Sequence, residues 1–208
     1  MLDASSRRGF LGKLGLLSFS GSMSGDISAE WDLSWIRTIE RAKNVAVFDM
    51  PSIQDGLILD TATRYLDNCD AVYGAKSGAI AVLNIRTQAV GLALEDTMWR
   101  KYALGAQYSV KDPVTDQPAE RNRYRAVPAD AYPGTGALDD LRARGAIFLV
   151  CDFALGHLAG RLANAAGSTE EEVHRELRVS FIPGAIAVPS GIFGMARAQN
   201  AGAAMVKM

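Results

Sequence analysis

Short runs of apolar residues alternate with helical patterns along this chain, and that alternation constrains its fold more than any other feature. Each run is nearly all Val, Ile, Leu, Ala or Phe and is bounded by Gly, Pro or polar residues, as buried strands are. The four clearest runs are residues 43–50, 79–85, 146–151 and 184–188, and residues 203–208 form a candidate for a fifth, edge strand. Apolar strands separated by helices predict a parallel sheet covered on both faces. We therefore expect an α/β fold, a three-layer sandwich with a mostly parallel sheet of about five strands.

The segments between these runs carry helical patterns, with one exception. Apolar spacing and capping signals predict helices at 27–42, 57–74, 87–104, 137–145, directly after residue 151, at 168–177 and at 189–202. In the helix at 87–104, Asp96 and Arg100 would pair at i,i+4. Residues 105–136 are instead dense in Pro, Asp and Gly and predict an unusually long loop, of a kind that is often functional. Since no repeat or second domain interrupts the pattern, residues 27–208 are expected to form one domain.

The first 26 residues are typical of a targeting segment, which should be kept apart from the fold. The tract SRRGFLGK at 6–13, with adjacent Arg7 and Arg8, resembles a twin-arginine export signal, and a modestly apolar stretch follows it. The resemblance implies export to the periplasm or the cell exterior, where cytoplasmic reducing conditions would not apply to the cysteines. The other interpretation is a basic start to an ordinary amphipathic helix.

Composition excludes several classes of function. Twenty-two basic residues against 23 acidic ones give a net charge of −1, with no long basic block outside the N-terminus, so no nucleic-acid partner is expected. No apolar run reaches the roughly 20 residues that a transmembrane helix needs. Two cysteines are too few for a disulfide scaffold, and two histidines lack the spacing of metal ligands. Glycine-rich nucleotide motifs are absent as well, so we expect neither a metal nor another cofactor.

Several tracts of the chain resemble the DsrE/DsrF-like family of small α/β proteins. The tract FIPGAIAVPSGIFGMARAQNAGAAMVK at 181–207 is similar to the C-terminal part of that family, and FLVCDFAL at 148–155 looks like its strand-then-cysteine element. The tracts DTMWRKYALG at 96–105 and KDPVTDQPAERN at 111–122 further resemble an exported subgroup with a twin-arginine signal. The resemblance implies a DsrE-like fold, a role in sulfur relay and assembly into a homo-oligomer.

Cys151 is the strongest candidate for chemistry. It ends a predicted strand and precedes a predicted helix, and ligands of open α/β sheets bind outside the carboxyl ends of the strands. The N–H groups at the helix start would favour the thiolate that a sulfur carrier or redox thiol requires, whereas the charge of Asp152 would oppose it. Arg86 ends the second predicted strand and is expected to face the same cleft. There it would hold an anion or a sulfur species, or else pair with Asp96 or with the long loop.

Three polar residues are further binding candidates. His157 would lie in the helix after Cys151 and line the same cleft without touching the thiol, or it would be an ordinary structural histidine. Arg121 and Asn122 belong to the long loop and would close over the cleft or bind a neighbouring subunit. Three more residues are expected to play structural parts: Cys69 in the core, His174 at the surface and Ser190 at a helix start.

Two classes of function remain open from the sequence. The first is a thiol-based sulfur-relay or redox protein that uses Cys151, assisted by Arg86, with a sulfur-carrying or protein partner. The second is a non-catalytic ligand-binding or assembly subunit that keeps the fold without the reactive set. The placement of Cys151 favours the first. The absence of another cysteine near it in the sequence favours the second.

Overall fold

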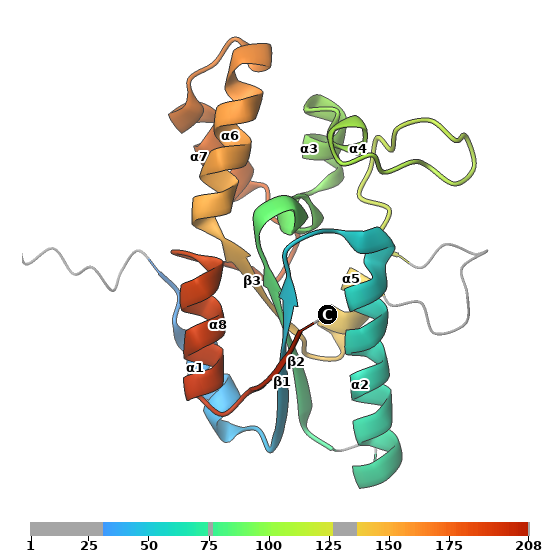
Figure 1. Cartoon of the computed structure of the whole chain (residues 1–208), viewed down its shortest axis with the longest axis vertical. Coiled ribbons are helices and arrows are strands. Elements are labelled where there is room, and N and C mark those ends of the chain that lie inside the picture. Colours follow the sequence, from blue (N-terminus) through green and yellow to red (C-terminus); the bar gives the residue numbers. More distant parts are fainter. Residues whose placement is uncertain (1–30, 75–76, 127–136, 208) are drawn as a thin grey trace, which may run out of the picture.

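The structure is a computed structural model that describes residues 31–74, 77–126 and 137–207. Its centre is a sheet of five parallel strands in the order β4-β3-β2-β1-β5 (Figure 1). The strands are β1 (Asn44–Met50), β2 (Ala79–Ile85), β3 (Ile147–Cys151), β4 (Ala185–Val188) and β5 (Ala204–Val206). The predicted α/β sandwich with a parallel sheet of about five strands is confirmed, including β5 at an edge. The signal segment expected at 1–26 lies outside the described residues.

Helices cover both faces of the sheet. On one face lie α2 (Leu57–Tyr73), α5 (Leu138–Ala143), α6 (Asp152–Ala166) and α7 (Glu170–Val179), and on the other lie α1 (Ser34–Arg41) and α8 (Gly191–Asn200). The turns beyond the carboxyl ends of β1 and β2 form η2 (Gln54–Gly56), η3 (Thr87–Ala93), α3 (Asp96–Lys101) and α4 (Leu104–Gln107). None of the helices in the described ranges combines the length and the apolar character needed to cross a membrane.

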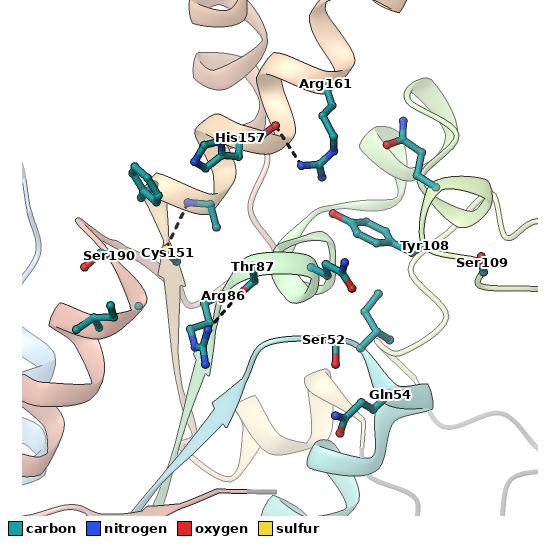
Figure 2. Close-up of a pocket in the computed structure, with 17 residues that line it drawn as sticks. Ser52, Gln54, Arg86, Thr87, Tyr108, Ser109, Cys151, His157, Arg161 and Ser190 are labelled. Carbon is teal, nitrogen blue, oxygen red and sulfur yellow. Dashed lines mark hydrogen bonds between the residues drawn. The ribbon is translucent and has the colours of Figure 1, made fainter.

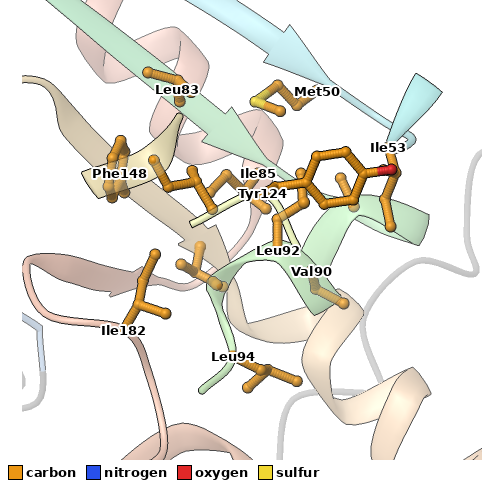
Figure 3. Close-up of a cluster of buried hydrophobic side chains, with 14 of the residues drawn as sticks. Met50, Ile53, Leu83, Ile85, Val90, Leu92, Leu94, Tyr124, Phe148 and Ile182 are labelled. Carbon is orange, nitrogen blue, oxygen red and sulfur yellow. The ribbon is translucent and has the colours of Figure 1, made fainter. Parts of the chain in front are cut away.

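The core consists of two apolar clusters, one on each face of the sheet. Figure 3 shows part of the larger cluster, which Tyr124 of the long loop joins. Alternate strand residues supply the two sides: Phe48, Leu83 and Phe148 the larger cluster, and Val47, Val82 and Leu149 the smaller one. Burying a side chain of this size contributes roughly 1.5–3 kcal/mol, and a one-residue slip would exchange the two sets. Burial on both faces therefore fixes the register of the three central strands, β1, β2 and β3, and the positions of their carboxyl ends.

The prediction of a continuous helix at 87–104 is wrong. The 3-10 helix η3 ends at Ala93, the next two residues are extended, and α3 and α4 follow as separate short helices. The extended residues bond to another segment, because Leu94 forms a bridge with Phe181 and the N–H of Glu95 donates to the carbonyl of Ser180 at 3.0 Å. These tertiary hydrogen bonds replace the helical ones that the apolar spacing predicted.

The long loop expected at 105–136 starts with α4 and is irregular after it, as far as residue 126. Asn122 ties the loop to the fold: its side-chain amide donates to the carbonyls of Leu92 and Leu94 at 2.8 and 3.1 Å. The N–H of Asn122 donates to the carboxylate of Asp96 at 2.9 Å. The predicted pairing of Asp96 with Arg100 is therefore replaced by a loop contact.

Gly105 allows the loop to pass directly over α4. A Cβ at this position would lie 2.2 Å from the carbonyl oxygen of Ala119 and 2.4 Å from its nitrogen, closer than any real side chain approaches. The carbonyl of Gly105 also accepts a hydrogen bond from Val110 at 2.8 Å. Backbone packs on backbone here, so the first part of the loop is a fixed element of the domain.

Replacing Gly105 by Ala is expected to lower the free energy of unfolding by about 1–3 kcal/mol. The new methyl group would collide with the backbone of Ala119, so the backbone itself would have to move. Gly156→Ala in α6 is the matched control, since a Cβ there meets nothing within 4 Å and helix propensity gains roughly 0.5–1 kcal/mol. Urea unfolding of the two variants measures both effects. Equal stability of the two would contradict the close contact at Gly105.

Candidate functional site

A cavity of about 940 Å³ lies beyond the carboxyl ends of the strands (Figure 2). Its wall comes from the turns after β1 (52–54), after β2 (86–88) and after β4 (190–192), from the end of α4 (107–109), and from Cys151 with one side of α6. Parallel pairing gathers these segments, because it brings the carboxyl ends of all strands to one edge. The volume is in the range of small-molecule sites in proteins.

The cavity lies where two neighbouring strands are followed by helices on opposite faces of the sheet. After β3 the chain enters α6 on one face of the sheet, and after the neighbouring β4 it enters α8 on the opposite face. Ligands of open α/β sheets bind in the crevice that such a switch creates. The N-terminus of α6 and the N-terminus of α8 both line the cavity, so both helix dipoles present their positive ends to it.

Cys151 ends β3 and caps α6, as the sequence predicted. Its Sγ accepts a hydrogen bond from the N–H of Ala154 at 3.3 Å. The residue lines the cavity, although only 5% of its surface is exposed. Cys69 is similarly buried at 7% and lies on the inner face of α2, away from the cavity wall, so its predicted place in the core is confirmed. The chain therefore has two buried thiols, of which one borders the cavity.

Arg86 lines the same cavity as Cys151, and its ion-pair partner is Asp49. The guanidinium binds the carboxylate through two hydrogen bonds, Nε to Oδ1 at 2.6 Å and Nη2 to Oδ2 at 2.7 Å. This pair lowers the pKa of Asp49 against the effect of its burial and raises the pKa of Arg86, to which the nearby Cys151 adds a smaller contribution. Asp96 and the long loop, which were the alternatives from sequence, are not its partners. The partner is a buried strand residue, only 6% exposed.

Gly191 holds the other side of Arg86. A Cβ at residue 191 would lie 2.8 Å from Cβ and from Cδ of Arg86, so the first turn of α8 packs against the arginine stem only because glycine stands there. The remaining nitrogen, Nη1, donates to the hydroxyl of Thr87 at 3.2 Å. Arg86 is thus oriented from three sides, and its side chain remains 31% exposed.

Backbone strain gathers at the cavity wall. Gln54, Thr87 and Ser109 adopt left-handed conformations with φ of 46°, 52° and 55°, although none of them is glycine. Such a conformation costs of order 1–3 kcal/mol and is most unusual for a β-branched residue such as Thr87. The strain occurs where three turns bring polar side chains to the cavity. Strain of this kind is typical of binding sites.

His157 and Arg161 lie on the face of α6 that lines the cavity (Figure 2). The ring of His157 packs edge-on against the exposed Phe153 at 4.6 Å between centroids. Its carbonyl accepts a hydrogen bond from Arg161 at 3.3 Å. Of the two positions that the sequence left open for His157, the structure has the one in the cavity wall. Arg161 was not among the residues that the sequence singled out.

Asp152, whose charge was expected to oppose a thiolate at Cys151, is held by α7. Its Oδ1 lies 3.1 Å from Nε2 of His174 and 3.7 Å from Nε of Arg178. His174, expected at the surface, keeps 26% of its side chain exposed and is half-buried by this contact. Since Arg178 supplies a positive charge beside the carboxylate, the negative charge next to Cys151 is compensated.

Arg121 and Asn122 do not line the cavity. Arg121 is largely exposed and lies 3.8 Å from the carboxylate of Asp112. Asn122 is 3% exposed and satisfies backbone groups of η3 and of residue 94. The two therefore organise the loop itself, and neither closes over Cys151.

Besides Arg161, two more residues were missed from the sequence, Asp49 and Tyr108. An acid near the end of an otherwise apolar strand pattern, as in NVAVFDM, was an available signal for Asp49. Tyr108 follows α4 inside the predicted loop and offers no comparable signal. Ser190 was expected as a helix start, and its side chain indeed accepts a hydrogen bond from Phe193 at 3.1 Å.

The fold and this cavity define the class of the protein: a three-layer α/β domain with a partly cationic cavity that a cysteine borders. In the described ranges no group of three or more His, Cys, Asp or Glu side chains is placed to hold a metal ion. No family model matches the sequence, and no curated protein matches it. A solved structure of a protein of unknown function, MTH1491 from Methanobacterium thermoautotrophicum, is similar at 12% identity with a TM-score of 0.38, over 80% of this chain and 100% of that one.

Asp49→Asn is expected to destabilise the fold by up to about 3 kcal/mol near neutral pH, since Arg86 loses its counter-charge. Because the folded-state pKa of Asp49 is lowered, the pair stabilises the fold above the ordinary pKa of 3.8, and this contribution is lost as the pH falls through the lowered value. The difference in unfolding free energy between wild type and variant should therefore shrink from about pH 6 to about pH 3 in urea titrations.

The control for this prediction is Glu171→Gln. It removes a carboxylate from an exposed i,i+4 pair with Arg175, so a change below about 0.5 kcal/mol is expected. A loss for Asp49→Asn that is as small as the control, or that does not depend on pH, would contradict an ion pair at Asp49.

Proposed function

We propose that this chain is a thiol-based sulfur-relay or redox protein that acts through Cys151. The observation that carries the proposal is the position of Cys151, which caps α6 at the wall of a cavity that also contains Arg86. The resemblance to the DsrE/DsrF-like family points to the same chemistry. Export by a twin-arginine route and assembly into a homo-oligomer belong to this proposal, and they rest on resemblance alone.

The surroundings of Sγ suit a nucleophilic sulfur. The N–H of Ala154 and the positive end of the α6 dipole place positive potential near it, and the guanidinium of Arg86, which Asp49 largely neutralises, adds a smaller contribution. The negative charge of Asp152 is compensated from α7. A thiolate at this position would be stabilised by groups that are already oriented in the structure.

Relay is the form of the chemistry that a single thiol supports. The Cys151 thiolate attacks the outer sulfur of a persulfide donor R–S–SH, the S–S bond of the donor breaks, and R–S⁻ leaves. Cys151 then carries the outer sulfur and its proton as a persulfide, and an acceptor thiolate takes that sulfur and restores the Cys151 thiolate. Neither step changes the total number of electrons or needs an oxidant. A dithiol cycle would need Cys69, which does not line the cavity.

A second candidate is the non-catalytic subunit that binds a ligand or a partner. The small exposure of Cys151 favours it, as do two apolar side chains at the cavity rim, Phe153 and Ile192, which are 67% and 73% exposed. Exposed apolar side chains at the mouth of a cavity are available for contact with a ligand or a partner. Under this proposal Sγ serves only as a helix cap. A copurifying partner would then stay bound to Cys151→Ala.

The two cysteines provide a matched test of the thiol. Iodoacetamide near neutral pH is expected to alkylate Cys151 in the folded protein, because a reagent can reach it through the cavity, and to leave Cys69 unmodified until the chain is unfolded. Peptide mass spectrometry after timed quenching measures both sites in one sample. If Cys151 reacts only after unfolding, as Cys69 should, the relay proposal falls and the subunit proposal remains.

A further inference from the structure

The wall of the cavity has cations, neutral polar groups and some apolar side chains, but no acid. Seventeen described residues line it, and neither Asp nor Glu is among them. The charged members are Arg86 and Arg161, together with His157, which becomes charged on protonation. Because Asp49 neutralises Arg86, the positive charge that is left for a ligand belongs mainly to Arg161.

Arg161 has no acidic partner within the described part of the chain. Its one hydrogen bond there is to the carbonyl of His157, at 3.3 Å, which leaves most of the guanidinium donors unused. Figure 2 shows the side chain reaching from α6 over the cavity toward the hydroxyl end of Tyr108. The two groups are close enough for Arg161 to affect the titration of Tyr108. An arginine in this arrangement offers a planar set of donors to an anion.

Tyr108 supplies a second, independent feature. Its hydroxyl oxygen is buried and has no hydrogen bond of acceptable geometry to any described residue. Burial raises the pKa of the hydroxyl to about 12, with smaller opposing effects from Arg161 and from the Gly91 amide, so the group keeps its proton at neutral pH. A buried hydroxyl without a partner is costly, and a ligand in the cavity would satisfy it.

The helix termini act in the same direction. The 15-residue helix α6 and the 10-residue helix α8 both begin at the cavity, with Cys151 and Ser190 as their capping residues. The N-terminus of a helix favours negative charge through its dipole, which acts here although the capping side chains already accept the N–H groups of Ala154 and Phe193. The volume of about 940 Å³ is larger than a single inorganic oxyanion requires. The rest of the wall is uncharged and mixed: Ser52, Gln54 and Gln107 are polar, whereas Ile53, Phe153 and Ile192 are apolar.

We propose that the cavity binds a small organic anion, whose negative group lies between Arg161 and the hydroxyl of Tyr108 and whose neutral polar part faces the turn after β1. This inference rests on the proposed function, because the anion would be the molecule that brings sulfur to Cys151 or accepts sulfur from it. The anion site itself does not need a reactive thiol, and the two proposals are therefore tested separately.

The first experiment compares two alkylating reagents that share a reactive group and differ in charge. Iodoacetate is anionic and iodoacetamide is neutral, so the ratio of their rates at Cys151 cancels the reactivity of the thiol and reports the local potential. Relative to the ratio for the unfolded chain, the folded protein is expected to favour iodoacetate at low salt, and Arg161→Gln to reduce that preference about threefold or more. Arg161→Lys should restore part of it.

Arg41→Gln is the matched control. It removes the same charge from an exposed arginine that precedes β1, at the opposite end of the sheet from the cavity, and should leave the ratio unchanged. A ratio that Arg161→Gln does not alter, or that Arg41→Gln lowers equally, would overturn the anion site.

The second experiment measures equilibrium binding without the thiol. Acetate, inorganic phosphate and sulfate are titrated separately into Cys151→Ala by calorimetry, and the tightest of the three identifies the anionic group. Arg161→Gln and Tyr108→Phe in that background are each expected to weaken this binding about threefold or more. Arg161-dependent binding in a protein whose Cys151 resists iodoacetamide would overturn the relay proposal and support the anion site. If iodoacetamide labels Cys151 but the cavity binds none of the three anions, the anion site is overturned and the relay proposal is supported.

Discussion

Parallel pairing of the strands is the constraint on which the rest of the structure depends. The three central strands β1, β2 and β3 are buried on both faces, so their register is fixed, and parallel pairing brings the carboxyl ends of all the strands to the same edge. Since the chain leaves β3 and β4 toward opposite faces, the edge opens between α6 and α8. The cavity, the capped thiol and both helix termini at the wall are consequences of that single arrangement.

The charges of the site depend on an acid that is buried inside the sheet. Asp49 is buried in β1, and its two carboxylate oxygens accept hydrogen bonds from one edge of the Arg86 guanidinium, which holds the arginine stem against the first turn of α8. The pair orients the Arg86 side chain and so fixes one wall of the cavity. Because the two charges are opposite, the pair contributes little net potential to the cavity. Arg161, without an acidic partner in the described ranges, then determines the sign of charge that the cavity accepts.

The sequence was sufficient for the strands and for the position of Cys151, because wholly apolar runs are specific to buried strands and their ends define the edge. The helix expected at 87–104 failed because the bonds from Leu94 and Glu95 to the segment at 180–182 outweigh local spacing. Ion pairs between residues far apart in the chain could not be predicted either, because they too depend on tertiary contacts. Nothing near Asp49 in the chain indicates Arg86, and nothing near Asp152 indicates His174.

The contact between Arg86 and Gly191 gives this cavity a signature that can be read in other chains. Any side chain at residue 191 would collide with the arginine stem, and losing the arginine would leave a buried carboxylate without a counter-charge. The three positions are thereby tied to one another: an acid one residue before the end of the first strand, an arginine just after the second, and a glycine at the start of the last helix. A distant homologue that keeps all three should keep the cavity, whereas one that replaces the glycine should have lost the acid and the arginine together.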